Sequence, residues 1–171
     1  MTPSAHYRMF GHYNAWANGR LYDSVARLST EQYRADRGAF FKSVHGTLNH
    51  LLVTDRIWMQ RFTGEGEAPN RLDAILFETF DALRAAREAE DRRIVGFVDG
   101  LDEGRIAGTI KYRRVSSPEE FEQQLAPALA HWFNHQTHHC GHVHALLTGL
   151  TGEAPELDLL IFQRRSGKPA A

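Results

Sequence analysis

The sequence predicts an all-α protein, a four-helix bundle with a short extended or hairpin insertion before the last long helix. Apolar residues recur at three- and four-residue spacing in four long segments, and only one short segment alternates β-branched and aromatic residues. The chain contains no internal repeat, low-complexity tract or interdomain linker. We therefore expect residues 1–171 to form a single domain around one core.

The composition is that of an ordinary globular protein, and it argues against several classes of partner. The 20 basic and 21 acidic side chains leave a formal charge of -1, which provides no basic field to hold nucleic acid. No apolar run approaches the roughly 20 residues of a membrane span, and the first residues lack the apolar segment of a signal peptide. The single cysteine, Cys140, cannot form an internal disulfide. We expect a soluble cytoplasmic protein that binds neither nucleic acid nor membranes.

The first two helices have the clearest patterns. In residues 6–28 the apolar side chains form one stripe, which indicates a helix with a single buried face. Residues 28–38 break this period and end at a glycine, so we expect a connection with about one turn of helix. Ser43 can cap a second helix, whose apolar stripe runs to a glycine stop at Gly64. His50 lies in the middle of this second helix.

The third segment joins a helix to the extended insertion. Asn70 can cap a helix whose apolar stripe covers residues 72–83. Its continuation, residues 84–93, is rich in charges at i,i+4 spacing, a pattern typical of a solvated face. Residues 105–115 then alternate β-branched and aromatic side chains, which favours a short extended or hairpin segment.

The last long helix has a strong predicted start. The stretch Ser117-Pro118-Glu119-Glu120 combines an N-cap, a proline at the first helical position and a capping-box glutamate, and the helix should run to Gly149. Pro127 removes one backbone donor inside it, so we expect a kink about two turns before its histidines. Residues 157–162 favour a short helix packed on the bundle, and residues 164–171 a frayed tail.

This last helix carries five histidines within ten residues, from His135 to His144. His135, His139 and His142 fall at i, i+4 and i+7, so their imidazoles leave one face of the helix. Two such neighbours can bind one ion, as in the H-x-x-x-H arrangement of zinc enzymes. The axial rise of about 1.5 Å per residue carries the third imidazole away. A further ligand must therefore come from elsewhere, and His50 is the best placed.

A site of three imidazoles would have catalytic character. With no carboxylate ligand, the ion keeps its full charge and has open coordination positions, unlike a closed structural site. Imidazole suits several divalent ions, and we take zinc and nickel as the leading candidates, with iron, copper and manganese as alternatives. The plainer interpretation is that His135 and His139 are core histidines bonded to neighbouring carbonyl groups. For His50 alone, the residues do not decide between the two interpretations.

The other residues of the histidine-rich stretch are expected outside the ligand shell. His142 shares the ligand face but lies further along the axis, which favours a proton shuttle or a substrate contact over an additional ligand. His138 and His144 point away from the ligand pair and should lie at the surface or in a second layer. Cys140 is rotated about 100° from His139, which favours a packed core thiol over a ligand or a nucleophile.

Several residues on the first two helices have two interpretations each. Asp55 and Thr54, one turn from His50, either orient its imidazole or are solvated. Tyr13 and Asn14 lie towards the bundle interior, where they either line a pocket or only pack. The tryptophans are expected in the core: Trp16, Trp58 and Trp132.

Three stretches of the chain match the motifs of a known family. They are Tyr13-Asn14-Ala15-Trp16-Ala17-Asn18, the run Thr47-Leu48-Asn49-His50 with Asp55 and Trp58, and Asn134-His135-Gln136-Thr137-His138-His139-Cys140-Gly141. Together they span nearly the whole chain, which resembles the DinB/YfiT-like family of metal-dependent proteins, a bacterial damage-inducible group with a four-helix bundle. The family places its three metal ligands on positions that are here His50, His135 and His139.

The resemblance also implies a class of activity and an assembly. Better characterised relatives include thiol-dependent transferases and a mycothiol-dependent maleylpyruvate isomerase, so it implies a small-molecule substrate, a low-molecular-weight thiol among the candidates, and a homodimer. This chain departs from the family where the motif usually continues as His-Arg-Gly-Gln, because it has His139-Cys140-Gly141-His142. Because of this difference, the surroundings of the site and its preferred metal need not be those of the family.

Two functions of the protein are consistent with these residues. In the first, a metal-dependent hydrolase or thiol-dependent transferase uses the tri-histidine site to activate water or a thiol cosubstrate on a small molecule. In the second, a non-catalytic stress-response protein binds a metal or a small ligand. Metal removal followed by metal titration against candidate substrates distinguishes them.

Overall fold

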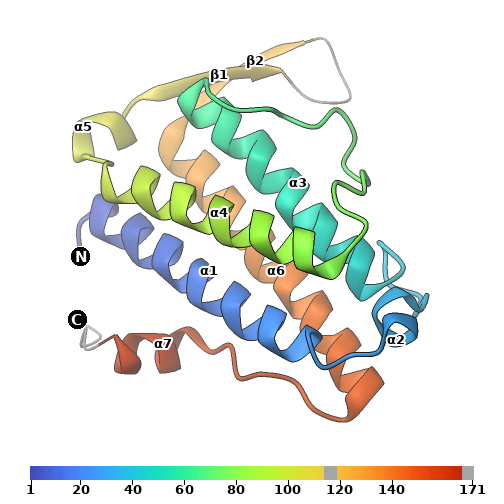
Figure 1. Cartoon of the computed structure of the whole chain (residues 1–171). Coiled ribbons are helices and arrows are strands. Elements are labelled where there is room, and N and C mark those ends of the chain that lie inside the picture. Colours follow the sequence, from blue (N-terminus) through green and yellow to red (C-terminus); the bar gives the residue numbers. More distant parts are fainter. Residues whose placement is uncertain (114–118, 167–171) are drawn as a thin grey trace.

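The structure, a computed structural model, describes residues 1–113 and 119–166. Four long helices form a bundle (Figure 1): α1 (Pro3–Val25), α3 (Val44–Thr63), α4 (Phe80–Asp99) and α6 (Leu125–Thr151). Three short helices complete the helical part: α2 (Thr30–Arg34), α5 (Glu103–Ile106) and α7 (Leu159–Arg165). A single antiparallel hairpin of β1 (Thr109–Arg113) and β2 (Glu120–Gln124) precedes α6 within the described residues. The predicted class, an all-α bundle with a hairpin insertion, is confirmed.

The order of the helices in the bundle depends on one long connection. Residues 64–79 run back along α3, so α3 and α4 begin at the same end of the bundle (Figure 1). Helix α6 packs against both α1 and α3, and α1 also packs along α4. This arrangement places the middle of α3 against the middle of α6, where the histidines of the two helices lie.

The start of the third long helix differs from the sequence prediction. The structure begins α4 at Phe80 behind a Thr79 cap, and the predicted helical residues 70–79 form an irregular connection. Side chains of α3 bind the backbone of this connection: the Asn49 amide oxygen accepts from the N–H groups of residues 76 and 77. Backbone groups bonded to another helix are not available for helical hydrogen bonds, so the apolar stripe packs without forming a helix.

The start of α6 also differs. Ser117 and Pro118, the core of the predicted capping signal, lie outside the described residues, and Glu120–Gln124 form strand β2. Cross-strand partners explain the strand, because Tyr112 stacks on Phe121 and the Leu125 N–H donates to the Gly108 carbonyl. Pro127 is then the third helical residue, where no N–H is needed for an internal hydrogen bond, so the basis for the expected kink disappears.

The remaining elements follow their local signals. Helix α1 begins at Pro3 behind a Thr2 cap, three residues before the predicted range, and α2 is the expected single turn behind a Ser29 capping box. Helix α3 has the predicted Ser43 cap and ends at Gly64 in the left-handed conformation. Within the described residues, no helix is both long and apolar enough to span a membrane.

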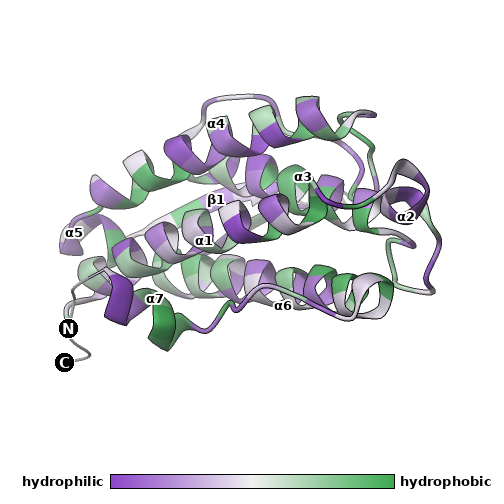
Figure 2. Cartoon of the chain, turned by 60° about the horizontal axis from the view of Figure 1, so that its bottom comes forward, coloured by the Kyte–Doolittle hydropathy of each residue, from purple (hydrophilic) through white to green (hydrophobic). Residues whose placement is uncertain are grey.

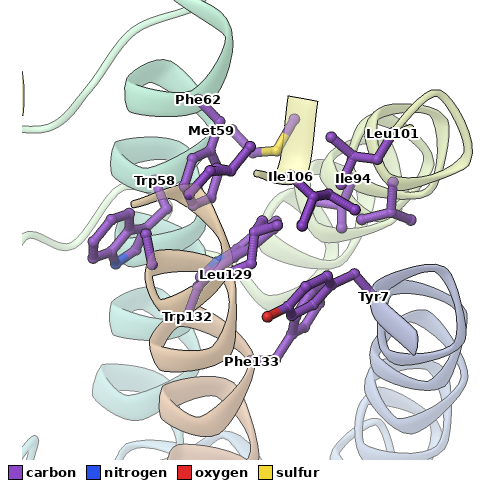
Figure 3. Packing of buried hydrophobic residues seen from close by; sticks show 13 residues of the cluster. Tyr7, Trp58, Met59, Phe62, Ile94, Leu101, Ile106, Leu129, Trp132 and Phe133 are labelled. Atoms are coloured by element: carbon purple, nitrogen blue, oxygen red, sulfur yellow. The ribbon is translucent and has the colours of Figure 1, made fainter. Parts of the chain in front are cut away.

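Two apolar clusters fill the bundle, and a polar layer lies between them. The first contains Trp132 and Phe62 at the hairpin end (Figure 3), and the second contains Leu48 and Leu147 at the other end. The long helices accordingly carry hydrophobic and hydrophilic residues along their length (Figure 2). Buried polar side chains occupy the intervening turns of all four helices: Asn14, Asn18, Asp55, Arg87, Asp91 and Gln136.

Candidate metal centre

Three histidines from α3 and α6 meet beside the polar layer. The possible ligand nitrogens of His50, His135 and His139 all lie within 4.8 Å of one another. His50 Nε2 is 3.3 Å from His135 Nε2. Ligands at about 2.0–2.1 Å in a tetrahedral shell are separated by about 3.3 Å, so this spacing is what one shared ion requires. The structure therefore brings together the three residues that the sequence singled out, and their donor set fits a divalent ion.

The tautomer of His50 is set by the connection that follows α3. Its Nδ1 lies 2.7 Å from the carbonyl oxygen of Leu72, which can only accept a hydrogen bond. Nδ1 must therefore carry the proton, and in the neutral ring the Nε2 lone pair faces His135. The irregular course of residues 70–79 thus has a direct role at the site, because a helix there would use this carbonyl internally.

The loop before α3 covers the same imidazole. Phe41 stacks on His50 with ring centroids 3.8 Å apart and meets His139 edge-on at 5.5 Å. Its backbone passes close to α3 at Gly46, where a side-chain carbon would overlap the Phe41 carbonyl oxygen. The turn is closed by a 2.7 Å hydrogen bond from the Lys42 N–H to the Ala39 carbonyl. Phe41 is thereby held over the centre.

Burial keeps the three imidazoles neutral. His50 is 3% exposed and His139 is 8% exposed. Burial, reinforced by the neighbouring histidines, lowers the pKa of His135 to about 4 and that of His139 to about 3. Burial also lowers the pKa of His50. Because metal binds the deprotonated imidazole, the site is prepared for an ion at neutral pH without having to release protons.

A groove of about 750 Å³ opens beside the triad. It runs between α3 and α6, and its α3 wall extends from His50 to Arg61, a rise of about 16 Å along the axis. The side chains that line it are apolar, aromatic, polar or basic, and none of the described ones is acidic. They are His50, Thr54, Ile57, Trp58, Arg61, Leu72, Tyr112, Gln123, Pro127, His131 and His135. The arrangement suits a small molecule whose reacting end lies at the histidines.

The other histidines of α6 extend the row of imidazoles. The His142 ring lies 5.0 Å from His139, outside the mutual contacts of the triad, as the axial rise led us to expect. His138 is exposed, as expected, yet its ring is 4.8 Å from His139 and 4.3 Å from His142. The helical wheel misses this contact because imidazoles on adjacent turns reach across the angle between them. His131, which the sequence analysis did not single out, lines the groove.

Asp55 has neither of the two roles considered for it. It is 1% exposed and pairs with Arg87 of α4 at 2.5 Å, so it is not solvated. Its other oxygen accepts hydrogen bonds from Trp132 Nε1, at 2.7 Å, and from Gln136 Nε2. Because these donors occupy both oxygens, Asp55 ties α3 to α4 and α6 rather than orienting His50. Thr54 donates to the His50 carbonyl.

Of the remaining candidates, Trp58 lines the groove, whereas Cys140, Tyr13, Trp132 and Trp16 pack elsewhere. Burial raises the pKa of the Cys140 thiol to about 12, which fits the expected core thiol and not a nucleophile. Tyr13 donates to the Leu157 carbonyl at 2.6 Å, beneath the chain segment that leads to α7. Trp132 is fully buried and Trp58 nearly so, whereas Trp16 is only half-buried against Phe162, so for Trp16 the core prediction is only partly met.

Comparison with known proteins agrees with this architecture. The family model of the DinB family matches residues 1–168. The chain is similar to "Protein DinB" of Bacillus subtilis (strain 168), with 24% identity over 167 residues that cover 91% of this chain and 94% of that protein. With a helical bundle, a hairpin before the long last helix and a histidine cluster between α3 and α6, the chain belongs to the DinB family.

Proposed function

We propose that this protein is a divalent-metal-dependent enzyme that acts on a small molecule bound in the groove between α3 and α6. His50, His135 and His139 would hold the ion, with zinc or nickel as the leading candidates. The observation that carries the proposal is the open tri-imidazole arrangement itself: three neutral donors without a carboxylate, at one end of a groove of about 750 Å³.

The prediction that residues 1–171 form a single domain stays a prediction.

The chain's own residues prepare the site for hydrolysis or for thiol and group transfer. When bound, the ion would lower the pKa of a water or a low-molecular-weight thiol and polarise an electrophile. The Leu72 carbonyl keeps the His50 Nε2 lone pair directed at the site. Phe41 covers His50 on the loop side, which leaves the groove as the approach for substrate. Apolar walls such as Ile57 and Trp58 exclude water from the substrate body.

Metal removal and replacement tests this function. The purified protein is treated with a chelator and then titrated with zinc or nickel against a panel of esters, amides and thiol conjugates. We expect turnover to be lost on chelation and to return at about one equivalent of metal per chain. A control variant, His144→Gln, should behave like the wild type, because residue 144 lies about 180° around the helix from His135. Metal uptake without turnover of any panel compound would favour the alternative, a non-catalytic metal- or ligand-binding protein.

The groove also has a basic end that indicates the charge of the substrate. The Arg61 guanidinium lies over the rings of Trp58 and Tyr112, with its Cζ 4.6 Å and 4.4 Å from their centroids. It also donates to the Arg113 carbonyl at 3.3 Å. These contacts hold a cation in place far along the groove from His50. Because no acidic side chain is among the described residues of the lining, an anionic group at this end would meet favourable charge.

Arg61→Gln is expected to weaken the binding of anionic substrates. Since a hydrogen bond to a charged group contributes about 1.5–3 kcal/mol, KM for a substrate with a carboxylate should rise by about tenfold or more. KM for the matched uncharged substrate and the metal content should stay unchanged. Arg56→Gln is the matched control, because Arg56 lies on the same helix and faces Glu90 instead of the groove. Equal losses for both substrates would show that Arg61 acts only on the structure.

The homodimer that the family resemblance implies stays a prediction. Light scattering at micromolar concentration should give twice the mass of the chain. A monomer mass under these conditions would remove the prediction and would leave the metal centre unaffected, because all three proposed ligands lie in one chain.

A further inference from the structure

The row of imidazoles on α6 continues beyond the proposed ligands to a second cluster. His138 and His142 lie one turn apart, at i and i+4, with ring centroids separated by 4.3 Å. Together with His139 they form a group whose possible ligand nitrogens all lie within 4.8 Å of one another. The spacing criterion that His50, His135 and His139 meet is therefore met a second time, with His139 as the member common to both groups.

The second cluster is more accessible than the first. His138 is exposed and His142 is half-buried, whereas His50 and His139 are buried. His142 borders a separate hollow of about 450 Å³ whose lining includes Arg37 and Phe40 and shares no residue with the groove. Solvent and ions therefore reach His138 and His142 without entering the substrate groove.

The ring nitrogens of His138 and His142 are not engaged by the described part of the protein. Within residues 1–113 and 119–166, neither His138 nor His142 has a hydrogen-bond or ion-pair partner, and their ring-to-ring contacts are with each other and with His139. The described protein groups therefore leave the ring nitrogens of both residues available to solvent or to an ion. An H-x-x-x-H pair on an exposed helix face offers two imidazole donors on adjacent turns, a pairing that suits a borderline divalent ion.

We propose that His138 and His142 form a second, outer divalent-metal position, and that His139 is shared between this position and the inner centre of His50 and His135. The outer position would take zinc, nickel or copper, the ions that imidazole ligands suit best. The sharing of His139, though not the outer pair itself, rests on the proposed function of the inner centre.

The sharing of His139 makes the two positions antagonistic. The Leu72 carbonyl fixes the His50 ring, but Nδ1 of His139 has no hydrogen-bond partner among the described residues. When the inner centre holds its ion through His139, the outer ion has only two imidazoles and binds weakly. When the inner centre is disabled, His139 completes the outer triad and binding there tightens. An ion held outside needs only to exchange His138 and His142 for His50 and His135, so the outer position can load the inner centre.

Zinc titration of the full chain tests the outer position. The metal-free protein is titrated calorimetrically with zinc alone. We expect one tight and one weaker equivalent for the wild type, and only the tight one for His138→Gln/His142→Gln. The matched control His144→Gln should retain both equivalents. The double variant His50→Ala/His135→Ala should keep one equivalent and bind it more tightly than the weaker wild-type equivalent. Circular dichroism checks that each variant is folded.

The outcomes separate this inference from the proposed function. Two equivalents in His138→Gln/His142→Gln would overturn the outer position. A single wild-type equivalent that disappears in His50→Ala/His135→Ala would also overturn it, while the inner centre would stand. A single equivalent that survives in His50→Ala/His135→Ala but disappears in His138→Gln/His142→Gln would support the outer position and overturn the inner centre.

Discussion

Alanine at His50 or at His135 is expected to weaken zinc binding at the inner centre by more than about a hundredfold, because loss of even an outer-layer partner of a ligand costs 10–100-fold. Each substitution leaves two of the three imidazoles that now lie within 4.8 Å of one another. Competition with a chelating indicator gives the affinity. The measurement is made in the His138→Gln/His142→Gln background, so that the outer histidines cannot replace the lost ligand.

Two comparisons make this result specific. His144→Ala removes a histidine from the same helix on the face away from the site, and its zinc affinity should equal that of the background. His131→Ala removes an exposed imidazole of the groove whose ring lies 6.2 Å from His135, and it should also retain the ion. An unchanged affinity in the His50 or the His135 variant would exclude that residue from the ligand set.

The histidine cluster of the proposed metal site is accessible to sequence reasoning because helix geometry is local. The i,i+4 pair of His135 and His139 fixes two donors by spacing alone. His50 is the best-placed further candidate by its position, but the residues alone do not decide its role, because no local rule states which residue of another helix faces a given turn; the family resemblance implies that it is a ligand. The contact between His138 and His139 was missed for a related reason: a helical wheel gives the direction of each Cβ, whereas imidazole rings reach further and meet across adjacent turns.

The fold class is confirmed, but the predicted starts of two long helices are wrong because contacts with other elements override the local preference. Residues 72–83 have a helical stripe, but α3 side chains such as Asn49 bind the backbone at 76 and 77, so the helix begins only at Phe80. The stretch 119–124 carries helix-start residues, but pairing with β1 makes most of it a strand. Asn49 is distant in sequence from the backbone that it binds, and no local pattern indicates this contact. The partner of β2 is the neighbouring strand, within the hairpin segment that the alternation of residues 105–115 predicts, but the helix-start signal at 117–120 hid the second strand.

The charged stretch 84–93 is the most consequential misinterpretation. Its i,i+4 charges predict a solvated face, and Arg84 with Glu88 does form an exposed pair of that kind. Arg87, Glu90 and Asp91 are instead buried. Counting charges cannot separate the two faces, because the inward charges are compensated by residues on other helices.

Arg87 is the centre of that buried network. Its guanidinium lies 2.5 Å from Asp55 of α3 and 2.9 Å from Asp91 on its own helix. Asp91 in turn accepts a hydrogen bond from Asn18 of α1, and Asp55 accepts one from Trp132 of α6. One cation therefore connects, through two carboxylates, all four long helices beside the proposed metal centre.

Arg87→Met is expected to lower the free energy of unfolding by about 3–5 kcal/mol at neutral pH, because it leaves two buried carboxylates without their cation. This is a large part of the roughly 5–15 kcal/mol that stabilises a typical domain. Urea unfolding of the metal-free protein measures it as a lower midpoint at constant slope. Arg84→Met is the matched control on the same helix. Arg84 also pairs with two carboxylates, Asp23 at 2.7 Å and Glu88 at 3.1 Å, but these are exposed, so the cost should be about 0–1 kcal/mol.

The penalty of Arg87→Met should also depend on pH in one direction. Burial already raises the pKa of Asp55 to about 6 against the opposing effect of Arg87, and burial likewise raises the pKa of Asp91. Without Arg87 both pKa values rise further, so the folded variant binds protons that the unfolded chain, with ordinary carboxyl pKa values, has released. Its stability therefore falls as pH rises through this range, and the penalty should be largest near pH 8 and shrink towards about pH 5. A penalty that does not change with pH, or equal losses in Arg87→Met and Arg84→Met, would show that Arg87 contributes packing rather than charge compensation.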